Sequence, residues 1–414
     1  MDDEKQEDTS GWLADTARWV FRPKRVLFEE AALDYELGRR LRDRFTGRAA
    51  GAPAAGVGGP VPPVEVRMIP SHNRVTGLPG GTPAQAYLEA KRTLVVGVRR
   101  GLSFASCRPS AHYQLPLVTS CPGLCEYCYL QTTLGRRPYV RVYVNLDEIF
   151  SRARELVEAA VSGGAGGAVG SGTGDGVGAR AGGRGGPVSF EAAAVGDPVP
   201  VEPLTGALAR AVEFFAGLEN ARFRFVTKFP SVEGLLGLDH RGHTRVRVTV
   251  NTERVIRAYD HGTPGLATRL DTLAHLARAG YPVGLMVAPV MPEGNWKTEY
   301  EDLFRRLAET LPAGPARGRP GAAGGLDGAD GATEEACPTI EVVTHRFTES
   351  ARRVIRERHP GTTLPMGEEG RQHKLGQFGY FKYVYPPALR AEVEELFQRL
   401  AGRHLPGAVF DYTV

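Results

Sequence analysis

The sequence predicts an α/β protein: a partial (β/α)6 barrel of the TIM type, with N-terminal and C-terminal extensions packed on it. In residues 113–347, six strand-like runs alternate with helical patterns, which implies a parallel sheet with right-handed crossovers. Six strands are too few for a closed eight-stranded barrel, so we predict an open one. The strands are expected at Gln114–Ser120, Val188–Val195, Arg222–Phe229, Arg245–Asn251, Pro282–Met291 and Thr339–Phe347.

The helices between these strands are predicted from their apolar period. In Thr268–Ala279, Leu270, Leu273 and Ala277 share one face, whereas Arg269 lies off it. A glycine follows this helix, as is typical of a helix end. The other helices are expected at Leu146–Val161, Pro203–Leu218, Val232–Leu238 and Lys297–Leu311.

The flanking segments differ from this alternating pattern. We expect residues 1–20 to be disordered, residues 21–112 to form an N-terminal α/β extension, and residues 348–414 to form a C-terminal extension. The elements expected in the extensions are the helix Tyr35–Phe45, the strand Thr93–Val98, and the helices Thr348–His359 and Pro387–Arg403.

Three segments rich in Gly, Ala or Pro interrupt the chain, at residues 48–63, 163–186 and 312–332. Segments of this composition bury too little apolar surface to offset the entropy lost on ordering, so we predict flexible surface loops. The second contains several closely spaced glycines, but it lacks the Gly-Lys-Ser/Thr ending of a phosphate-binding loop.

Charge and hydropathy exclude several classes of protein. Lys and Arg number 51 against 47 Asp and Glu, a net charge of +4 that does not by itself indicate a nucleic-acid partner. The longest apolar run, Val283–Met291, is far shorter than the roughly twenty residues of a membrane-spanning helix. The acidic N-terminus is unlike a secretory signal. We therefore expect a cytoplasmic protein with no membrane partner.

The strongest motif is Cys121-Pro-Gly-Leu-Cys125-Glu-Tyr-Cys128, which directly follows the first predicted barrel strand. Thiolates favour soft metals, and three of them on a four-iron cluster leave one iron open to a small molecule. Ligands of parallel α/β folds also bind at the carboxyl ends of strands. Two alternatives stay open: a zinc site completed by His112 or Cys107, and three thiols without metal.

The motif and its surroundings resemble a known family. The cysteine spacing is similar to that of the radical S-adenosylmethionine (SAM) superfamily. The segments that resemble the spore photoproduct lyase family in particular are Pro109-Ser-Ala-His-Tyr, Cys128-Tyr-Leu-Gln-Thr-Thr, Arg136-Arg-Pro-Tyr-Val-Arg-Val-Tyr-Val-Asn, Phe225-Val-Thr-Lys-Phe, His345-Arg-Phe-Thr and Lys374-Leu-Gly-Gln-Phe-Gly-Tyr-Phe-Lys-Tyr-Val-Tyr. The similarity runs from about Arg22 to the C-terminus, interrupted by the Gly-rich segments.

The resemblance implies a 4Fe-4S cluster on the three cysteines, with SAM bound to its open iron. It implies a lyase that reverts 5-thyminyl-5,6-dihydrothymine in UV-damaged double-stranded DNA to two thymines, through a 5′-deoxyadenosyl radical. A ferredoxin or flavodoxin is the expected one-electron donor. Two alternatives are a radical SAM enzyme with an altered substrate or outcome, and a non-catalytic iron–sulfur protein that binds damaged DNA.

The resemblance also assigns roles to residues on the barrel strands. Lys228 is expected to bind the carboxylate of SAM, Thr249 and Asn251 its ribose, and Ala288 to let the adenosyl group approach the backbone. From the residues alone, an alternative for Lys228 is a lysine at a strand end whose charge reaches solvent, and ordinary strand packing explains the other three equally well.

One position departs from the family pattern. The family donates a hydrogen atom from a cysteine on the second strand, but here that position is Ala194, and Gly196 replaces a serine that contacts SAM. Tyr127 and Tyr129 match the family's hydrogen-atom relay, although aromatic packing around a cluster is the plainer interpretation. The candidate donors are Tyr127, Tyr129, Cys107 and Cys337, and we hypothesise that one of the two tyrosines serves.

Contact with DNA is predicted in the C-terminal extension. Arg352, Arg353 and Arg356 are expected on one helix face, where they would neutralise phosphates, although a solvated surface helix explains them equally well. A Tyr-rich stretch with lysines is predicted to form a hairpin that wedges at the lesion. The DNA-contacting residues are predicted to be Arg346, Arg352, Arg353, Arg356, Lys374 and Tyr380.

Overall fold

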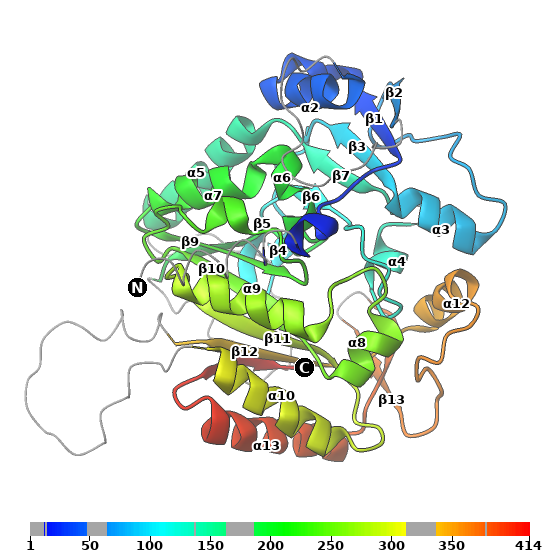
Figure 1. Cartoon of the computed structure of the whole chain (residues 1–414), viewed down its shortest axis with the longest axis vertical. Coiled ribbons are helices and arrows are strands. Elements are labelled where there is room, and N and C mark those ends of the chain that lie inside the picture. Colours follow the sequence, from blue (N-terminus) through cyan, green and yellow to red (C-terminus); the bar gives the residue numbers. More distant parts are fainter. Residues whose placement is uncertain are drawn as a thin grey trace, which may run out of the picture.

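The computed structural model describes residues 12, 15–47, 64–135, 138–162, 186–311, 337–376 and 379–414. The predicted loops at residues 48–63 and 312–332 lie outside this set, as does 163–186 apart from its last residue. The described strands form a five-stranded sheet, an eight-stranded sheet and a two-stranded hairpin (Figure 1).

The eight-stranded sheet confirms the predicted partial barrel. Its strand order is β15-β12-β11-β10-β9-β8-β5-β4, and the six strands from β5 to β12 are parallel neighbours. They are β5 (Ala111–Gln114), β8 (Val188–Glu191), β9 (Ala221–Thr227), β10 (Thr244–Val250), β11 (Val283–Val290) and β12 (Thr339–Thr344). The parallel strand β15 (Val409–Thr413) extends one end, and the antiparallel β4 (Ser106–Cys107) extends the other.

The first barrel strand was predicted wrongly, at Gln114–Ser120. The strand is β5, which ends at Gln114, and β6 (Val118–Thr119) pairs instead with β7 (Val140–Tyr143) of the other sheet. Pro116 lies between them, and because proline has no amide hydrogen it cannot continue a ladder inside a sheet.

The five-stranded sheet carries the N-terminal extension, in the order β2-β1-β3-β7-β6. β6 and β7 come from the segment that was assigned to the barrel, so the two sheets are linked across the predicted boundary at residue 112. The predicted helix and strand of this extension are confirmed to within two residues. The new elements are β1 (Arg25–Glu29), β2 (Glu65–Ile69), β3 (Thr93–Gly97), η2 (Glu30–Asp34), α2 (Glu36–Thr46) and α3 (Pro83–Lys91).

Helices cover the outer face of the barrel sheet (Figure 1). The predicted helix Pro203–Leu218 is divided at Gly206, which has φ 64°, into α6 and α7. Val232–Leu238 is only the short 3-10 helix η4, and α8 was not predicted. The helices are α4 (Leu130–Thr133), α5 (Leu146–Ser162), α6 (Glu202–Thr205), α7 (Ala207–Ala216), α8 (Glu253–Tyr259), α9 (Leu266–Arg278), α10 (Trp296–Thr310), α12 (Glu349–Arg358) and α13 (Pro387–His404), with the 3-10 helices η1 (Ala17–Trp19), η3 (Val199–Val201) and η4 (Glu233–Leu235).

The two faces of the barrel sheet differ in chemistry. Along β9, Phe223 and Phe225 are fully buried against the outer helices, where Phe215 stacks on Phe223 at a centroid distance of 5.0 Å. Burying each such ring stabilises the fold by roughly 2–3 kcal/mol. The alternate residues, such as Arg224, point into the barrel. The described part of the chain contains no helix long and apolar enough to span a membrane.

The N-terminus is more structured than predicted. Residues 12 and 15–20 were expected to be disordered, but Trp12 is buried and stacks on His275 at 4.0 Å. Trp19, in η1, packs edge-on against Phe229 at 6.3 Å. Two aromatic side chains therefore hold this segment on the barrel, which offsets the entropy of ordering it.

Candidate active site

The cysteine loop starts where the backbone turns sharply after β6. Ser120 has φ 66°, and its amide donates to the Val195 carbonyl at 2.7 Å while its hydroxyl donates to the Pro138 carbonyl at 3.0 Å. The Lys91 ammonium donates to the Ser120 hydroxyl at 3.1 Å and to the Cys121 carbonyl at 2.8 Å. The start of the loop is therefore fixed against both sheets.

The segment after α8 holds the other side of the loop. The Leu124 amide donates to the His261 carbonyl at 2.8 Å, and the Glu126 amide donates to the Tyr259 carbonyl at 3.0 Å. The His261 ring lies 2.9 Å from a Glu126 carboxylate oxygen. Because both edges of the loop are bonded, its three cysteines are held in place at the carboxyl edge of the barrel.

The cysteines are shielded from solvent and face a positive charge. Cys125 is buried, and Cys121 and Cys128 are partly buried. Burial raises the pKa of Cys125 to about 12, and the ammonium of Lys228, 3.4 Å from its sulfur, opposes that rise. A soft cation would stabilise the thiolates that metal binding requires.

The arrangement fits a cluster better than a single ion. Among the described residues, no three side chains of Cys, His, Asp or Glu converge closely enough to hold one metal ion. In a four-iron cluster each cysteine binds a different iron, so Cys121, Cys125 and Cys128 need not converge on one point. This geometry does not match the zinc alternative, which needs its ligands around one ion.

A buried charge network adjoins the loop. The Lys228 ammonium, just after β9, lies 2.9 Å from the Asp260 carboxylate, and the guanidinium of Arg269 lies 2.6 Å from the same carboxylate. The Tyr127 hydroxyl donates to Asp260 as well. Burial alone would raise the pKa of Asp260, but Lys228 and Arg269 lower it to about 2. Asp260 is therefore ionised at neutral pH.

Two members of this network were missed from the sequence. Arg269 was assigned to the polar face of its helix, yet its side chain is fully buried because it reaches back to Asp260. Asp260 directly follows α8, which was itself not predicted. The local signal was the acidic residue Asp260 directly after a helix, but nothing in its spacing connects it to Lys228.

The predicted ribose contacts differ in their surroundings. Asn251 is fully buried, and its side chain bonds to the Pro289 carbonyl, the Thr252 amide and the Tyr300 hydroxyl at 2.7–2.9 Å. Its side-chain oxygen and one amide hydrogen are thus bonded inside the protein, and its contact with a ribose stays a prediction. Thr249 is buried on β10.

Ala288 lies on the more accessible side of β11. Leu285 and Val287 are buried, whereas Met286 and Ala288 are half-buried, as expected for a strand with one face on the core. The small side chain of Ala288 leaves room next to the backbone at this position, which is compatible with its predicted role.

One of the two predicted relay residues, Tyr129, contacts position 194. Tyr129 is 57% exposed and its hydroxyl donates to the Ala194 carbonyl. Burial raises the pKa of Tyr129, and the charges of Cys128 and Cys107 add to the rise. Cys337 precedes the amino end of β12, whereas the cysteine loop lies at the carboxyl edge. Cys337 is therefore far from the place where a donor is needed.

The structure explains why position 196 is a glycine. A Cβ added to Gly196 would lie 2.4 Å from the Ser120 carbonyl oxygen, and the two residues form an isolated parallel bridge. No side chain fits at that distance. A glycine at this position therefore allows the backbone to pack closely against Ser120, at the start of the cysteine loop.

The predicted DNA-binding helix is α12. Arg353 and Arg356 are exposed on it. Arg352 is different, because its side chain is 15% exposed and ion-paired with Glu349 and, at 3.0 Å, with Glu368. The prediction that all three arginines share one free face is wrong for Arg352, since its charge is already neutralised.

The Tyr-rich stretch forms the predicted hairpin, made of β13 (Gln372–Leu375) and β14 (Phe381–Val384). Leu375 and Phe381 pair across it and are each 60% exposed, and Tyr380 is 43% exposed. Lys374 pairs with Lys382, and burial together with Arg346 and Lys374 lowers the pKa of Lys382. The hairpin thus combines exposed apolar side chains with closely spaced cations.

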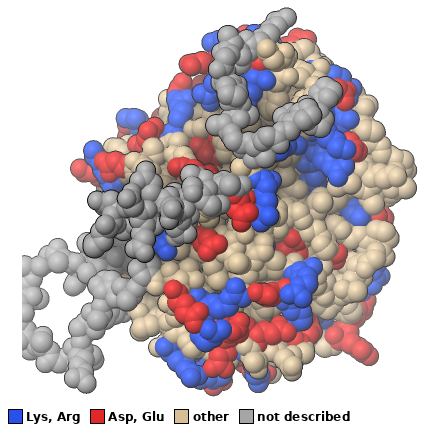
Figure 2. All heavy atoms as spheres, viewed as in Figure 1, with Lys and Arg blue, Asp and Glu red and all other residues tan. Residues whose placement is uncertain are grey.

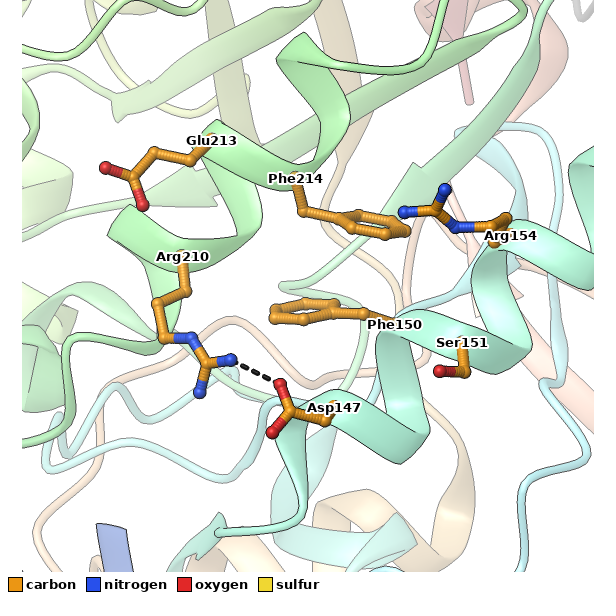
Figure 3. Close-up of a pocket in the computed structure, with 7 residues that line it drawn as sticks. All are labelled: Asp147, Phe150, Ser151, Arg154, Arg210, Glu213 and Phe214. Carbon is orange, nitrogen blue, oxygen red and sulfur yellow. Dashed lines mark hydrogen bonds and ion pairs between the residues drawn. The ribbon is translucent and has the colours of Figure 1, made fainter. Parts of the chain in front are cut away.

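A cavity away from the cysteine loop contains none of the predicted site residues. It lies between α5 and α7 and has a volume of about 440 Å³. Figure 3 shows Phe150 and Phe214 stacked in it and Arg210 turned toward Asp147, and the two rings lie 4.9 Å apart. Figure 1 places α5 and α7 on the opposite side of the barrel from α4, which follows the cysteine loop. We therefore assign the active site to the loop.

Three cysteines with this spacing, at the carboxyl edge of a half-barrel and beside a buried lysine, define the class of protein: a radical SAM enzyme. The family model described as "Spore photoproduct lyase" matches residues 21–163, 184–318 and 328–414. The breaks in this match fall within two of the predicted Gly-rich loops. The chain belongs to the spore photoproduct lyase family.

Relatives and solved structures of this family match almost the whole chain. Spore photoproduct lyase of Clostridium acetobutylicum is 38% identical over 94% of this chain and 98% of that protein, and the Geobacillus sp. protein is 39% identical over 95% and 98%. A solved spore photoproduct lyase with AdoMet and a dinucleoside spore photoproduct bound has a TM-score of 0.78 and 38% identity, covering 95% of this chain and 99% of that one. That structure is a variant with one cysteine replaced by alanine and one serine replaced by cysteine.

Proposed function

We propose that this chain reverts spore photoproduct in UV-damaged double-stranded DNA to two thymines, as a radical SAM carbon–carbon lyase. The observation that carries the proposal is the cysteine loop held beside Lys228 at the carboxyl edge of the barrel. A 4Fe-4S cluster with SAM bound supplies a radical able to remove hydrogen from an unactivated carbon. DNA and a low-potential reductant are both found in the cytoplasm, where we place the protein.

The residues of the chain bind and orient these groups. Cys121, Cys125 and Cys128 hold the cluster. Lys228 and Arg269 place two positive charges against the single carboxylate of Asp260, so a second carboxylate, that of SAM, is favourable there. Thr249 and Ala288 lie along the neighbouring strands, where the adenosyl group would extend.

We assign hydrogen donation to Cys107, with Tyr129 as its relay partner. Position 194 has no transferable hydrogen, and Tyr127 is engaged with Asp260 and Lys228. Cys107 is partly buried on β4, where it pairs with Ala111 of β5, and burial raises the pKa of its thiol, so it keeps its hydrogen at neutral pH. This assignment replaces the hypothesis that a tyrosine gives hydrogen directly to the thymine.

The proposed hydrogen-atom transfers need no reactant other than the lesion, SAM and the side chains named. Removal of the C6 hydrogen breaks the carbon–carbon bond between the bases and leaves a radical on the methyl carbon of one thymine. The S–H bond of Cys107 then breaks as the C–H bond of the thymine methyl forms. Tyr129 would give its phenol hydrogen to the sulfur and would be restored by one hydrogen atom from the SAM-derived fragment, so that the hydrogen atom removed from C6 is balanced by the one added to the methyl carbon.

The DNA partner fits the hairpin and α12. Exposed Leu375 and Phe381 are suited to fill the space that an extruded lesion leaves in the stack, and Tyr380 adds an exposed aromatic ring. Arg346, Lys374, Arg353 and Arg356 are placed to neutralise phosphates on either side.

Product analysis of a synthetic spore photoproduct dinucleotide tests the proposal. We expect the anaerobically loaded chain, with SAM and a reductant, to produce the undamaged thymine dinucleotide by mass. Formation of 5′-deoxyadenosine while the lesion persists would instead support an altered substrate or outcome. No SAM cleavage would favour a non-catalytic DNA-damage-binding protein.

Two variants test the donor. In Cys107→Ala we expect SAM cleavage to continue while thymine restoration falls at least tenfold, whereas Cys337→Ala should behave as the wild type. Suppose instead that Cys107→Ala still restores thymine while the double variant Tyr127→Phe, Tyr129→Phe does not. The tyrosine hypothesis would then stand, and the assignment to Cys107 would be wrong.

A further inference from the structure

A second cavity, of about 300 Å³, lies directly behind the cysteine loop. Pro122 and Leu124 form part of its wall, so the wall is one residue away from Cys121 and Cys125 in the chain. We call this cavity the basic groove. It is lined by Arg18, Trp19, Val20, Phe21, Arg22, Leu88, Lys91, Arg92, Pro122, Leu124, Phe229 and Gly262.

An aromatic wall connects the basic groove to the cysteines. A Cβ built on Gly123 would lie 3.5 Å from the Cys121 sulfur and 3.8 Å from Phe229, so both press against the same glycine. Trp19 packs edge-on against Phe229 at 6.3 Å. The preceding residue, Lys228, points to the opposite side, toward Cys125. The groove therefore approaches the cluster site from behind, away from the side where Lys228 would bind SAM.

The charge of the groove has one sign. Four of its lining residues are Lys or Arg, and none is Asp or Glu. The side chains of Arg18 and Arg92 are 59% and 42% exposed, and their carboxylate neighbours Asp15 and Glu89 lie as far away as 3.7 and 3.8 Å. Figure 2 shows Lys and Arg side chains gathered over the N-terminal elements on this face. Weak surface pairs of this kind leave most of the positive potential in place.

We propose that the basic groove is the docking site for an acidic one-electron carrier protein, of the flavodoxin type, which reduces the cluster. Charge complementarity selects the occupant, because a carrier with carboxylates around its cofactor meets three accessible arginines and no carboxylate in the lining, while the fourth cation, Lys91, is buried behind them. The position selects the purpose, because the groove adjoins the cluster loop without covering the SAM side. One electron leaves the anionic flavin hydroquinone, which becomes the neutral semiquinone, and enters the cluster; no bond of this chain changes.

The inference rests on the proposed function only in requiring a reducible cluster. The test compares a groove variant, Arg18→Glu with Arg22→Glu and Arg92→Glu, with a control variant of equal charge change. Lys91 is left intact because it fixes the cysteine loop. The control combines Arg241→Glu, Arg257→Glu and Arg399→Glu, whose side chains are 65%, 81% and 61% exposed elsewhere on the surface.

Two measurements are made with the cluster-loaded chain. Calorimetry at low salt measures the affinity for oxidised flavodoxin, and chromatography measures 5′-deoxyadenosine formed from SAM without any lesion, driven by flavodoxin hydroquinone or by dithionite. In the groove variant we expect flavodoxin affinity and the flavodoxin-driven rate each to fall at least tenfold. The dithionite-driven rate should stay within twofold of wild type, and the control variant should change each quantity less than threefold.

Two results would overturn the inference. Equal losses in the groove and control variants would show that net charge, not this surface, governs the encounter. An equal loss with flavodoxin and with dithionite would show that these arginines support the cluster site itself. A chain that cleaves SAM with flavodoxin but leaves the lesion intact would contradict the proposed function and leave the docking site standing.

Discussion

Two buried charge networks lie in the same half-barrel, and they differ in their balance of charge. The inner network lies in the middle of the barrel, where Arg247 bonds Glu341 at 2.7–2.8 Å and Arg224 lies 3.1 Å from Asp411. Its charged members are two arginines and three carboxylates: Arg224, Arg247, Glu191, Glu341 and Asp411.

The edge network lies at the carboxyl ends of the strands and has the opposite balance. Lys228 and Arg269 share the single carboxylate of Asp260, and the surplus positive charge faces Cys125. The inner network has one more carboxylate than arginines and fills the barrel, whereas the edge network has one more cation than carboxylates and so favours a further anion. The comparison teaches that burial and ion pairing alone do not mark a functional site; the sign of the unbalanced charge does.

Removing a carboxylate from the inner network should have the largest effect on stability. Glu341 is fully buried between two arginines and also accepts a bond from Tyr412 at 3.0 Å. We expect Glu341→Gln to lower the free energy of unfolding by about 3–5 kcal/mol, because it removes the buried carboxylate that both arginines share. Denaturant unfolding measures this, with the exposed Glu395→Gln as a control that changes stability by less than about 0.5 kcal/mol. A loss below about 1 kcal/mol would contradict the inner network's structural role.

Acid should weaken the edge network in a defined pH range. The pKa of Asp260 falls from an ordinary 3.8 to about 2, so the folded state binds its proton less readily than the unfolded state. Its contribution, about 2 kcal/mol, is present above pH 4 and lost as pH falls toward 2. Asp260→Asn should therefore lose less stability than the wild type over that range in acid unfolding curves. Parallel curves for the two proteins would exclude the ion pair as the cause.

The surplus charge of the edge network should be visible in SAM binding. Lys228→Met removes one of the two cations, and we expect SAM affinity of the cluster-loaded chain to fall at least tenfold by equilibrium binding, about 1.4 kcal/mol. Lys297→Met serves as a control, because that lysine is 58% exposed on α10 and pairs with Glu392, not with the edge network. If Lys228→Met binds SAM as tightly as the wild type, the surplus charge has another purpose.

The smallest effect is expected outside both networks, on α12. Arg353→Gln with Arg356→Gln should reduce the salt dependence of DNA binding, lowering the slope of log affinity against log salt by about 2. Fluorescence anisotropy with undamaged duplex DNA measures the slope. Arg399→Gln with Arg403→Gln on α13 is the matched control, and equal slopes in the two double variants would remove α12 from the DNA surface.

The sequence was most informative where function depends on neighbours in the chain. The cysteine loop is one segment of eight residues, so its motif can be read directly. The barrel strands after the first were located from their apolar runs, because the residues that make a strand buried are consecutive in the sequence. The exception, β5, was misplaced because the apolar run continues across Pro116 into β6. The departure at Ala194 was also visible directly in the sequence.

The sequence alone therefore determined the class of fold, the cysteine motif and the missing cysteine at position 194. Only the tertiary structure decided which charges meet. Asp260 and Arg269 join Lys228 across segments more than 30 residues apart, Gly196 presses against Ser120, and Trp19 reaches Phe229 from the far N-terminus. The physical reason is that charge balance and close packing depend on distance in space, which the crossovers of a parallel barrel separate from distance along the chain.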